Sequence, residues 1–149
     1  MRRKTKYQNS AEIVFPAKSQ NESLARSVVS SFLMQANPTI EEISDLKCAV
    51  SEAVTNCIVH GYAGGAGNIK MKMKLTEDGD AIIDIIDKGC GIEDVELAMT
   101  PMFTTNTDGD RTGMGFTVMQ TFTDKTKVTS SAGKGTKVRL IKKLQRDDT

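Results

Sequence analysis

The stretch from residue 43 to residue 62 constrains the fold of this chain most strongly. Its apolar residues recur at spacings of three and four, which predicts a long amphipathic helix that ends at Gly61. They are Ile43, Leu46, Val50, Ala53, Val54 and Cys57. Glu52, Asn56 and His60 follow one another four residues apart, so we expect them on one helix face at separations of about 6 Å. Each alone fits a solvated surface or a helix end, but together, and in combination with two glycine motifs further along the chain, they indicate a functional site.

Composition and charge narrow the classes of function. The 149 residues suit one domain with a sizeable core. Twenty basic and 19 acidic side chains give a formal charge of +1, which argues against nucleic acid as the direct ligand. No apolar run reaches the roughly 18 residues of a membrane span and the basic start precedes no signal-like segment, so we expect a cytoplasmic protein without membrane contact. The three cysteines lack a CxxC spacing and are expected to be reduced thiols rather than zinc ligands.

The first part of the domain predicts a strand and a helix. We expect a flexible N-terminus over residues 1–9, a single domain over 10–145 and a tail over 146–149. A strand is predicted over 12–15. Ser19-x-x-Glu22 has the form of a capping box and predicts a helix to about Ala36. Its expected apolar stripe is Leu24, Val28 and Phe32, with Arg26 outside it. Thr39-x-x-Glu42 repeats the capping box and begins the long helix.

Four further strands are predicted, over 69–75, 81–87, 125–130 and 135–141. Methionines and lysines alternate in the first of these, so one face is expected to be buried and the other wet. The turn at 77–80 contains Asp-Gly, a signal for a type I′ hairpin. The strand over 81–87 is almost wholly apolar and is therefore expected at the centre of the sheet.

Two glycine motifs indicate a ligand site. Asp87-Lys88-Gly89-Cys90-Gly91 follows the central strand, where glycines allow close approach to a ligand and a carboxylate can accept a hydrogen bond from an amino group. By itself this pattern also fits an ordinary turn. Gly113-Met114-Gly115 begins a helix predicted to reach Phe122, and the free N–H groups of a helix start suit phosphate. Arg111 could reach a terminal phosphate, and no P-loop motif occurs.

The segment 92–112 joins these two motifs. A short helix is predicted over 93–99, and the long polar stretch that follows is typical of a functional lid. Asn106, Asp108 and Asp110 resemble a calcium loop. Arg111 and Thr117 replace the glycine and the bidentate glutamate that such a loop needs, so calcium is excluded.

The ordered set of motifs resembles a known family. A Glu-x-x-x-Asn helix, Asp-x-Gly-x-Gly, a lid, Gly-x-Gly and a late Gly-Thr resemble the GHKL or Bergerat ATP-binding fold of gyrase-type ATPases, Hsp90 chaperones, histidine kinases and MutL. The resemblance is most specific to the anti-sigma serine/threonine kinases, especially the anti-sigma F factors of spore-forming bacteria, and spans about residues 12–144. Its specific segments are Ser51-Glu52-Ala53-Val54-Thr55-Asn56, His60-Gly61-Tyr62, Phe103-Thr104-Thr105 and Gly113-Met114-Gly115-Phe116.

The resemblance implies a fold and a set of site residues. The fold is an α/β structure, an α+β two-layer sandwich with a mixed, mostly antiparallel sheet, helices on one face and a mobile ATP lid. In the family pattern Glu52 is the base, Asn56 gives an oxygen to Mg²⁺ and Arg111 stabilises charge on the transferring group. The remaining residues expected to bind ATP or ADP are Asp87, which would bind the adenine amino group, Gly89, Gly91, Thr104, Thr105, Gly113, Met114, Gly115 and Thr136.

The resemblance also implies protein partners. The chain would form a homodimer, sequester a sporulation sigma factor of the sigma F type and phosphorylate a serine of the anti-anti-sigma protein. The added phosphate carries nearly two negative charges and can break that complex. Glu22 and Arg26 match the family's partner-contacting helix, so both partners would compete for one surface, with bound ATP or ADP deciding between them.

Other functions stay open, and the lid departs from the family pattern. A histidine kinase domain normally follows a dimerising helix with its own histidine, and a gyrase-like ATPase needs a transducer domain. A catalytically silent module that binds a sigma factor under nucleotide control would not need Glu52. Asn106-Thr107 stand where several anti-sigma F factors have lysine and proline, and Gly109 adds flexibility, so the resemblance does not decide the lid chemistry or the rate of nucleotide release.

Overall fold

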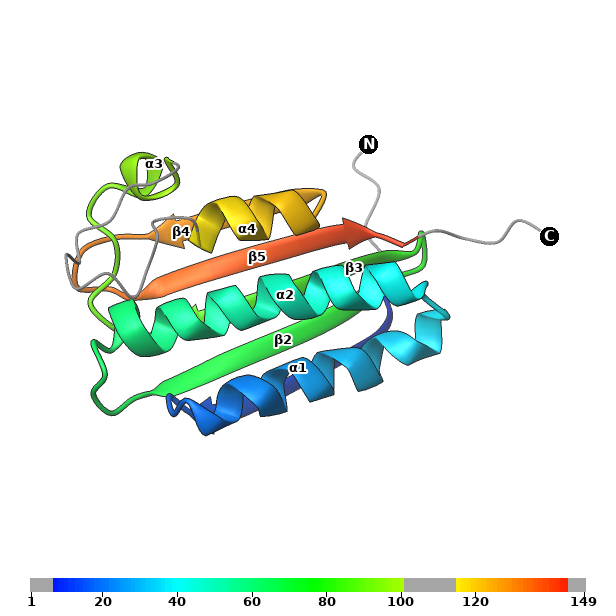
Figure 1. The fold of residues 1–149 in the computed structure, drawn as a ribbon, viewed down its shortest axis with the longest axis horizontal. Coiled ribbons are helices and arrows are strands. Elements are labelled where there is room, and N and C mark those ends of the chain that lie inside the picture. Colours follow the sequence, from blue (N-terminus) through cyan, green and yellow to red (C-terminus); the bar gives the residue numbers. More distant parts are fainter. Residues whose placement is uncertain (1–6, 101–114, 145–149) are drawn as a thin grey trace.

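The chain folds into two layers, a five-stranded sheet with helices on one face (Figure 1). The computed structural model describes residues 7–100 and 115–144. The strands are β1 (Tyr7–Pro16), β2 (Asn68–Thr76), β3 (Asp80–Asp87), β4 (Lys125–Ser130) and β5 (Thr136–Lys143), and the helices are α1 (Gln20–Leu33), α2 (Ile40–Asn56), α3 (Val95–Ala98) and α4 (Gly115–Phe122). The predicted α+β sandwich is confirmed. None of the helices within the described ranges is long and apolar enough to cross a membrane.

The sheet places β3 at its centre, as predicted. Its order is β1-β2-β3-β5-β4, and each neighbouring pair among these strands is antiparallel. In this register Asp87, the last residue of β3, lies opposite Ile69 on β2 and Thr136 on β5. Two residues far apart in the sequence and both expected at the nucleotide site, Asp87 and Thr136, are therefore neighbours at one end of the sheet.

Two local predictions about the strands need correction. β1 begins at Tyr7 rather than at residue 12, and residues 7–16 pair with residues 76–68 of β2, so the last part of the expected flexible start belongs to the sheet. The hairpin between β2 and β3 exists, but it is not type I′. Gly79 has φ +94° whereas Asp78 does not adopt a positive φ, and the Gly79 N–H donates to the Thr76 carbonyl. This is a three-residue loop, a turn followed by a left-handed glycine.

Helix α1 faces the sheet with a different stripe from the one predicted. Ala25, Val29 and Leu33 are fully buried, while Leu24 is 46% exposed. Val28 and Phe32 pack only at the edge of the core. The two stripes are one residue apart and both have helical spacing, so periodicity alone could not choose between them.

The predicted capping box at the start of α1 is also wrong. Ser19 has helical backbone angles and makes no side-chain cap, and the Glu22 carboxylate instead lies 2.9 Å from Arg26 Nε. After α1 a 3-10 turn over Met34–Ala36 ends at Asn37, which takes the left-handed conformation.

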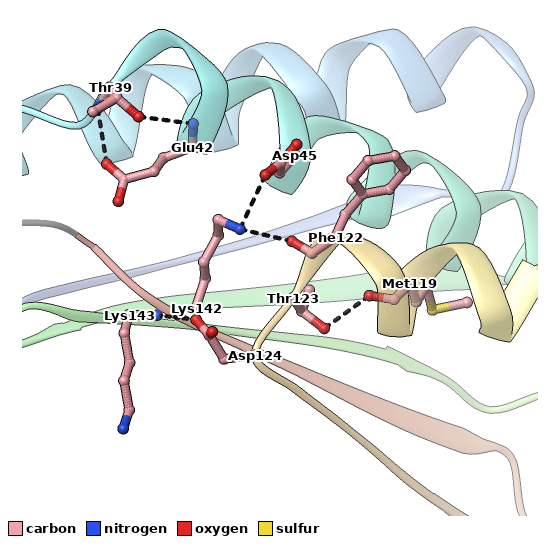
Figure 2. Close-up of polar contacts among 9 residues, drawn as sticks. All are labelled: Thr39, Glu42, Asp45, Met119, Phe122, Thr123, Asp124, Lys142 and Lys143. Carbon is pink, nitrogen blue, oxygen red and sulfur yellow. Dashed lines mark hydrogen bonds and ion pairs between the residues drawn. The ribbon is translucent and has the colours of Figure 1, made fainter.

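The start of α2 has the predicted capping box. Glu42 N–H donates to Thr39 Oγ1 at 3.1 Å and Thr39 N–H donates to Glu42 Oε1 at 2.8 Å (Figure 2). Its apolar side is buried at Leu46, Val50, Ala53 and Val54. After Asn56 the helix continues as a π-helical turn, Cys57–Gly61, so His60 does not continue the α-helical line of Glu52 and Asn56. Single π turns inside helices occur frequently at functional sites.

Hydrogen bonds from Lys142 hold the C-terminal end of α4 against α2 and β5 (Figure 2). Lys142 on β5 donates to Asp45 Oδ2 on α2 at 3.1 Å and to the carbonyl of Phe122, the last residue of α4, at 3.0 Å. Thr123 Oγ1 donates to the Met119 carbonyl at 2.8 Å, and Met119 itself is fully buried. With its far end held in this way, α4 begins over the second half of α2.

The face of the sheet without helices holds a buried ion pair that the sequence pattern did not predict. Asp84 on β3 is 2% exposed although it lies on this face. Arg139 on β5, directly opposite, binds it with two hydrogen bonds of 2.8 and 2.9 Å, and Lys137 Nζ lies 3.7 Å away. The hydrogen bond to Asp84 raises the pKa of Arg139 further.

Candidate active site

Glu52 and Asn56 lie one turn apart on α2, beneath the first residue of α4. A Cβ at position 115 would be 3.3 Å from Asn56 Nδ2, 3.4 Å from Asn56 Oδ1 and 3.5 Å from Glu52 Oε2. The carboxylate of Glu52 and the amide group of Asn56 thus both lie next to the glycine at the start of α4. A Cβ at position 115 would therefore be tight against Asn56 and in ordinary contact with Glu52. The predicted grouping of Glu52, Asn56 and Gly115 is therefore present.

Asp87, the last residue of β3, is the second part of the candidate site. It is 4% exposed, and its Oδ1 accepts the Gly89 N–H at 2.9 Å, which holds the carboxylate at the end of β3. Asp87 also faces the π turn, because a Cβ at Gly61 would lie 2.8 Å from its Oδ2. Burial raises the pKa of the Cys57 thiol, and the charge of Asp87 and a hydrogen bond to its carboxylate raise it further. Asp87, Cys57 and Gly61 therefore form one buried contact.

Glycines allow the backbone segments around Asp87 to touch. A Cβ at Gly89 would stand 1.9 Å from the Gly61 carbonyl oxygen, which accepts the Cys90 N–H at 2.8 Å. Gly91 has φ +75°, and a Cβ there would lie 2.0 Å from the Ser131 carbonyl oxygen. The two glycines predicted to admit a ligand are thus also required by close contacts within the protein.

Thr136 lies beside Asp87 and belongs to a small hydroxyl network. Its Oγ1 is 2.8 Å from Ser130 Oγ, which also donates to the Gly135 carbonyl at 2.7 Å and accepts the Ile92 N–H at 2.8 Å. Ser130 therefore links Ile92, in the loop after β3, to Gly135, in the turn between β4 and β5, through hydrogen bonds. Sequence analysis did not single out Ser130, because its role depends on the pairing of β4 with β5.

Tyr62 is a second residue whose structural role was not predicted. Its hydroxyl donates to the Asn68 carbonyl at 2.5 Å and accepts the Lys88 N–H at 2.8 Å. A Cβ at Gly67 would overlap the Tyr62 ring at 2.3 Å. Tyr62 thus joins the glycine-rich loop before β2 to the loop after β3, and its place in the motif with His60 and Gly61 was the available signal.

The expected partner-binding residues lie at the same site. Arg26 Nε is 2.9 Å from Glu22 Oε1 within α1, and Ser51 Oγ on α2 donates to the same Glu22 oxygen. Arg26 and Glu52 line one groove of about 440 Å³ between α1, α2 and α4. Its other lining residues are Ile40, Ile43, Ser44, Lys47, Cys48, Ser51, Val118 and Phe122.

Several predicted site residues cannot be compared with the structure. Arg111, Thr104, Thr105, Gly113 and Met114 lie outside the described residues, as do the lid positions Asn106, Thr107 and Gly109. The short helix predicted before them is present as α3, shortened to four residues.

The chain has close relatives along most of its length. The family model of the histidine kinase-like ATPase domain matches residues 15–142. An anti-sigma F factor of Thermoanaerobacter sp. (strain X514) is 56% identical over 142 residues, covering 95% of this chain and 98% of that protein. An anti-sigma F factor of Clostridium acetobutylicum is 50% identical over 137 residues, covering 92% and 95%.

Solved structures support the same fold. The RsbU and RsbW domains of Rv1364c from Mycobacterium tuberculosis superpose with a TM-score of 0.68 at 21% identity, over 93% of this chain and 33% of that one. The histidine kinase domain from Erythrobacter litoralis EL346 gives a TM-score of 0.54 at 16% identity, over 83% and 60%. The chain therefore belongs to the histidine kinase-like ATPase domain family and, within it, to the anti-sigma F factors.

Proposed function

We propose that this chain sequesters a sporulation sigma factor of the sigma F type and, as a serine protein kinase, phosphorylates the anti-anti-sigma protein with Mg-ATP. One observation carries the catalytic part. A Cβ placed on Gly115, the first residue of α4, would lie 3.5 Å from Glu52 Oε2 and 3.3 to 3.4 Å from the two amide atoms of Asn56, so both side chains reach the start of this helix. A carboxylate and an amide oxygen that converge on a helix N-terminus provide a base and a metal ligand where a terminal phosphate can bind.

The described residues fit a nucleotide and its metal ion. Among them, no group of three or more His, Cys, Asp or Glu residues could hold a metal alone. Mg²⁺ at phosphate-transfer sites keeps several waters and takes few protein oxygens beside those of the substrate phosphates, and Asn56 would supply one such oxygen. The ion would offset the charge that develops on the phosphates. Asp87 and Thr136 would hold the adenine end and Gly115 the phosphate end.

In this proposal Glu52 accepts the proton of the substrate serine hydroxyl as that oxygen attacks the terminal phosphorus of ATP. The bond from this phosphorus to the bridging oxygen breaks, and ADP leaves with that oxygen. The position of Glu52 beside Asn56 matters more than its basicity, because phosphoryl transfer depends chiefly on positioning and charge stabilisation. Arg111 would stabilise the transferring group. Glu22 and Arg26 would contact the sigma factor and the anti-anti-sigma protein in turn, on a homodimer in the cytoplasm.

The test measures phosphate transfer from labelled Mg-ATP to the anti-anti-sigma protein. We expect the parent to label a serine and Glu52→Gln to keep its ATP affinity while transfer falls by about 10²- to 10⁴-fold. Glu41→Gln is the control, because Glu41 is an exposed glutamate in the first turn of the same helix. If the parent binds a sigma factor but labels nothing, the chain is a nucleotide-controlled binding module, and the role given to Glu52 is wrong.

A further inference from the structure

One hydrogen-bond network joins the two helices that line the groove. Ser51 on α2 donates from Oγ to Glu22 Oε1 on α1, and the same carboxylate oxygen lies 2.9 Å from Arg26 Nε. Glu22 and Arg26 are one turn apart on α1, whereas Ser51 comes from 29 residues further along the chain. The network is partly buried, with the Glu22 side chain 24% exposed and that of Arg26 40% exposed.

The hydrogen bond from Ser51 restricts the ion pair between Glu22 and Arg26. An ion pair between residues i and i+4 on a helix surface is weak, because two long side chains must be held in one geometry against solvent. Arg26 Nε is buried and makes no aligned hydrogen bond despite its short distance to Glu22. A hydrogen bond from a neighbouring helix removes much of the freedom of the carboxylate, so the orientation of Arg26 becomes fixed by the packing of α1 on α2.

The orientation of Arg26 determines which groups its guanidinium can bind in the groove between α1, α2 and α4. Arg26 and Ser51 line it together with Glu52, the residue that follows Ser51 on α2. Ile43, Val118 and Phe122 add apolar surface to the same groove. A protein segment that carries a carboxylate next to an apolar side chain fits this lining, with the carboxylate on Arg26.

We propose that Ser51 is a positioning residue for the protein substrate. Its hydroxyl holds the Glu22 carboxylate, which in turn orients the guanidinium of Arg26. Arg26 then binds an acidic group of the substrate, so that the substrate serine lies next to Glu52. The inference rests on the proposed function and adds a residue to it. Ser51 acts through Glu22 and Arg26 and takes no proton or phosphate itself.

The experiment compares Ser51→Ala with Ser51→Thr in phosphate transfer to the anti-anti-sigma protein, with calorimetric binding of that protein to the nucleotide-bound chain. We expect Ser51→Ala to raise KM and Kd about tenfold, the size of one hydrogen bond to a charged group, while kcat stays within about twofold. Ser51→Thr keeps a hydroxyl and should restore KM to within about threefold of the parent. Ser31→Ala, an exposed serine on α1, is the control and should match the parent.

A double-mutant cycle tests whether Ser51 acts through Glu22. In a Glu22→Ala background the carboxylate is gone, so Ser51→Ala should change KM by less than about twofold. An equal effect in both backgrounds, or a loss of kcat at unchanged KM, would overturn the inference. A parent that binds the substrate protein but does not phosphorylate it would refute the kinase proposal alone, because the Kd values still compare the Ser51 variants. A parent that does not bind it refutes both.

Discussion

Gly133 and Gly135 offer a matched test of how the candidate site is held together. They lie in the same turn between β4 and β5 and have nearly equal positive φ values, +77° and +80°. They differ in their surroundings. A Cβ at Gly133 would meet nothing within 4 Å, whereas a Cβ at Gly135 would lie 2.2 Å from the Asp87 carbonyl oxygen and 2.9 Å from Lys88 Cα. Alanine at each position therefore separates backbone strain from contact with the Asp87 loop.

The expected loss in the free energy of unfolding has two sources, the strain of a positive φ and the overlap of the new Cβ with neighbouring backbone. The left-handed conformation costs alanine about 1 to 2 kcal/mol, so Gly133→Ala should lower the free energy of unfolding by about that amount. Gly135→Ala has the same strain plus an overlap with backbone, which adds about 1 to 3 kcal/mol because both segments must move. We expect the two variants to differ by about 2 kcal/mol, or about 1 M in urea midpoint for a typical m-value.

Urea unfolding measures the difference, and calorimetry with ADP supplies a second signal. The Asp87 backbone must shift in Gly135→Ala, so its ADP affinity should fall about tenfold, while Gly133→Ala should keep the parent value. Equal unfolding free energies for the two variants would show that the contact between Gly135 and Asp87 is not tight in solution. A large loss of stability with unchanged ADP affinity would separate this contact from the nucleotide site.

Three further predictions concern single contacts. Thr39→Ala removes the capping box of α2 and should cost about 1 kcal/mol in urea unfolding, whereas Ser19→Ala, which removes no cap, should cost less than about 0.5 kcal/mol. Asp84→Ala leaves Arg139 without its bidentate acceptor and should cost about 2 kcal/mol, less than for a fully buried pair because Arg139 is one third exposed. Folding raises the pKa of Cys57 well above 9.0, so the unfolded chain loses this proton first, and the free energy of unfolding should fall as pH rises above about 9. Cys57→Ala should lack that part of the pH dependence.

The parts of the fold that were predicted correctly follow from local rules. The long helix could be predicted because its apolar residues, from Ile43 to Cys57, keep helical spacing over about four turns. Its start could be predicted because the capping box joins Thr39 and Glu42, which are only three residues apart in the sequence. The central position of β3 followed from its apolar composition. Glu52 and Asn56 were paired correctly because their spacing on one helix needs no tertiary information.

The parts that could not be predicted depend on contacts between distant segments. Leu24, the bulkier residue, suggested the core stripe of α1, but the buried line passes through Ala25, which is fully buried while Leu24 is 46% exposed. The burial of Asp84 depends on Arg139, 55 residues away, in the facing position of β5. Neither partner can be inferred from the neighbours of the other along the chain.

The Glu22 carboxylate can either complete a capping box at the start of α1 or bind Ser51 on the neighbouring helix, but it cannot do both. The sequence Ser19-x-x-Glu22 permits a capping box, which would turn the Glu22 side chain back toward the start of α1. In the structure its carboxylate instead accepts a hydrogen bond from Ser51 on α2 and lies beside Arg26, one turn further along α1. Thr39 and Glu42, in contrast, form the capping box that their sequence permits. The departure from the local pattern at Glu22 therefore marks the place where α1 contributes to the groove.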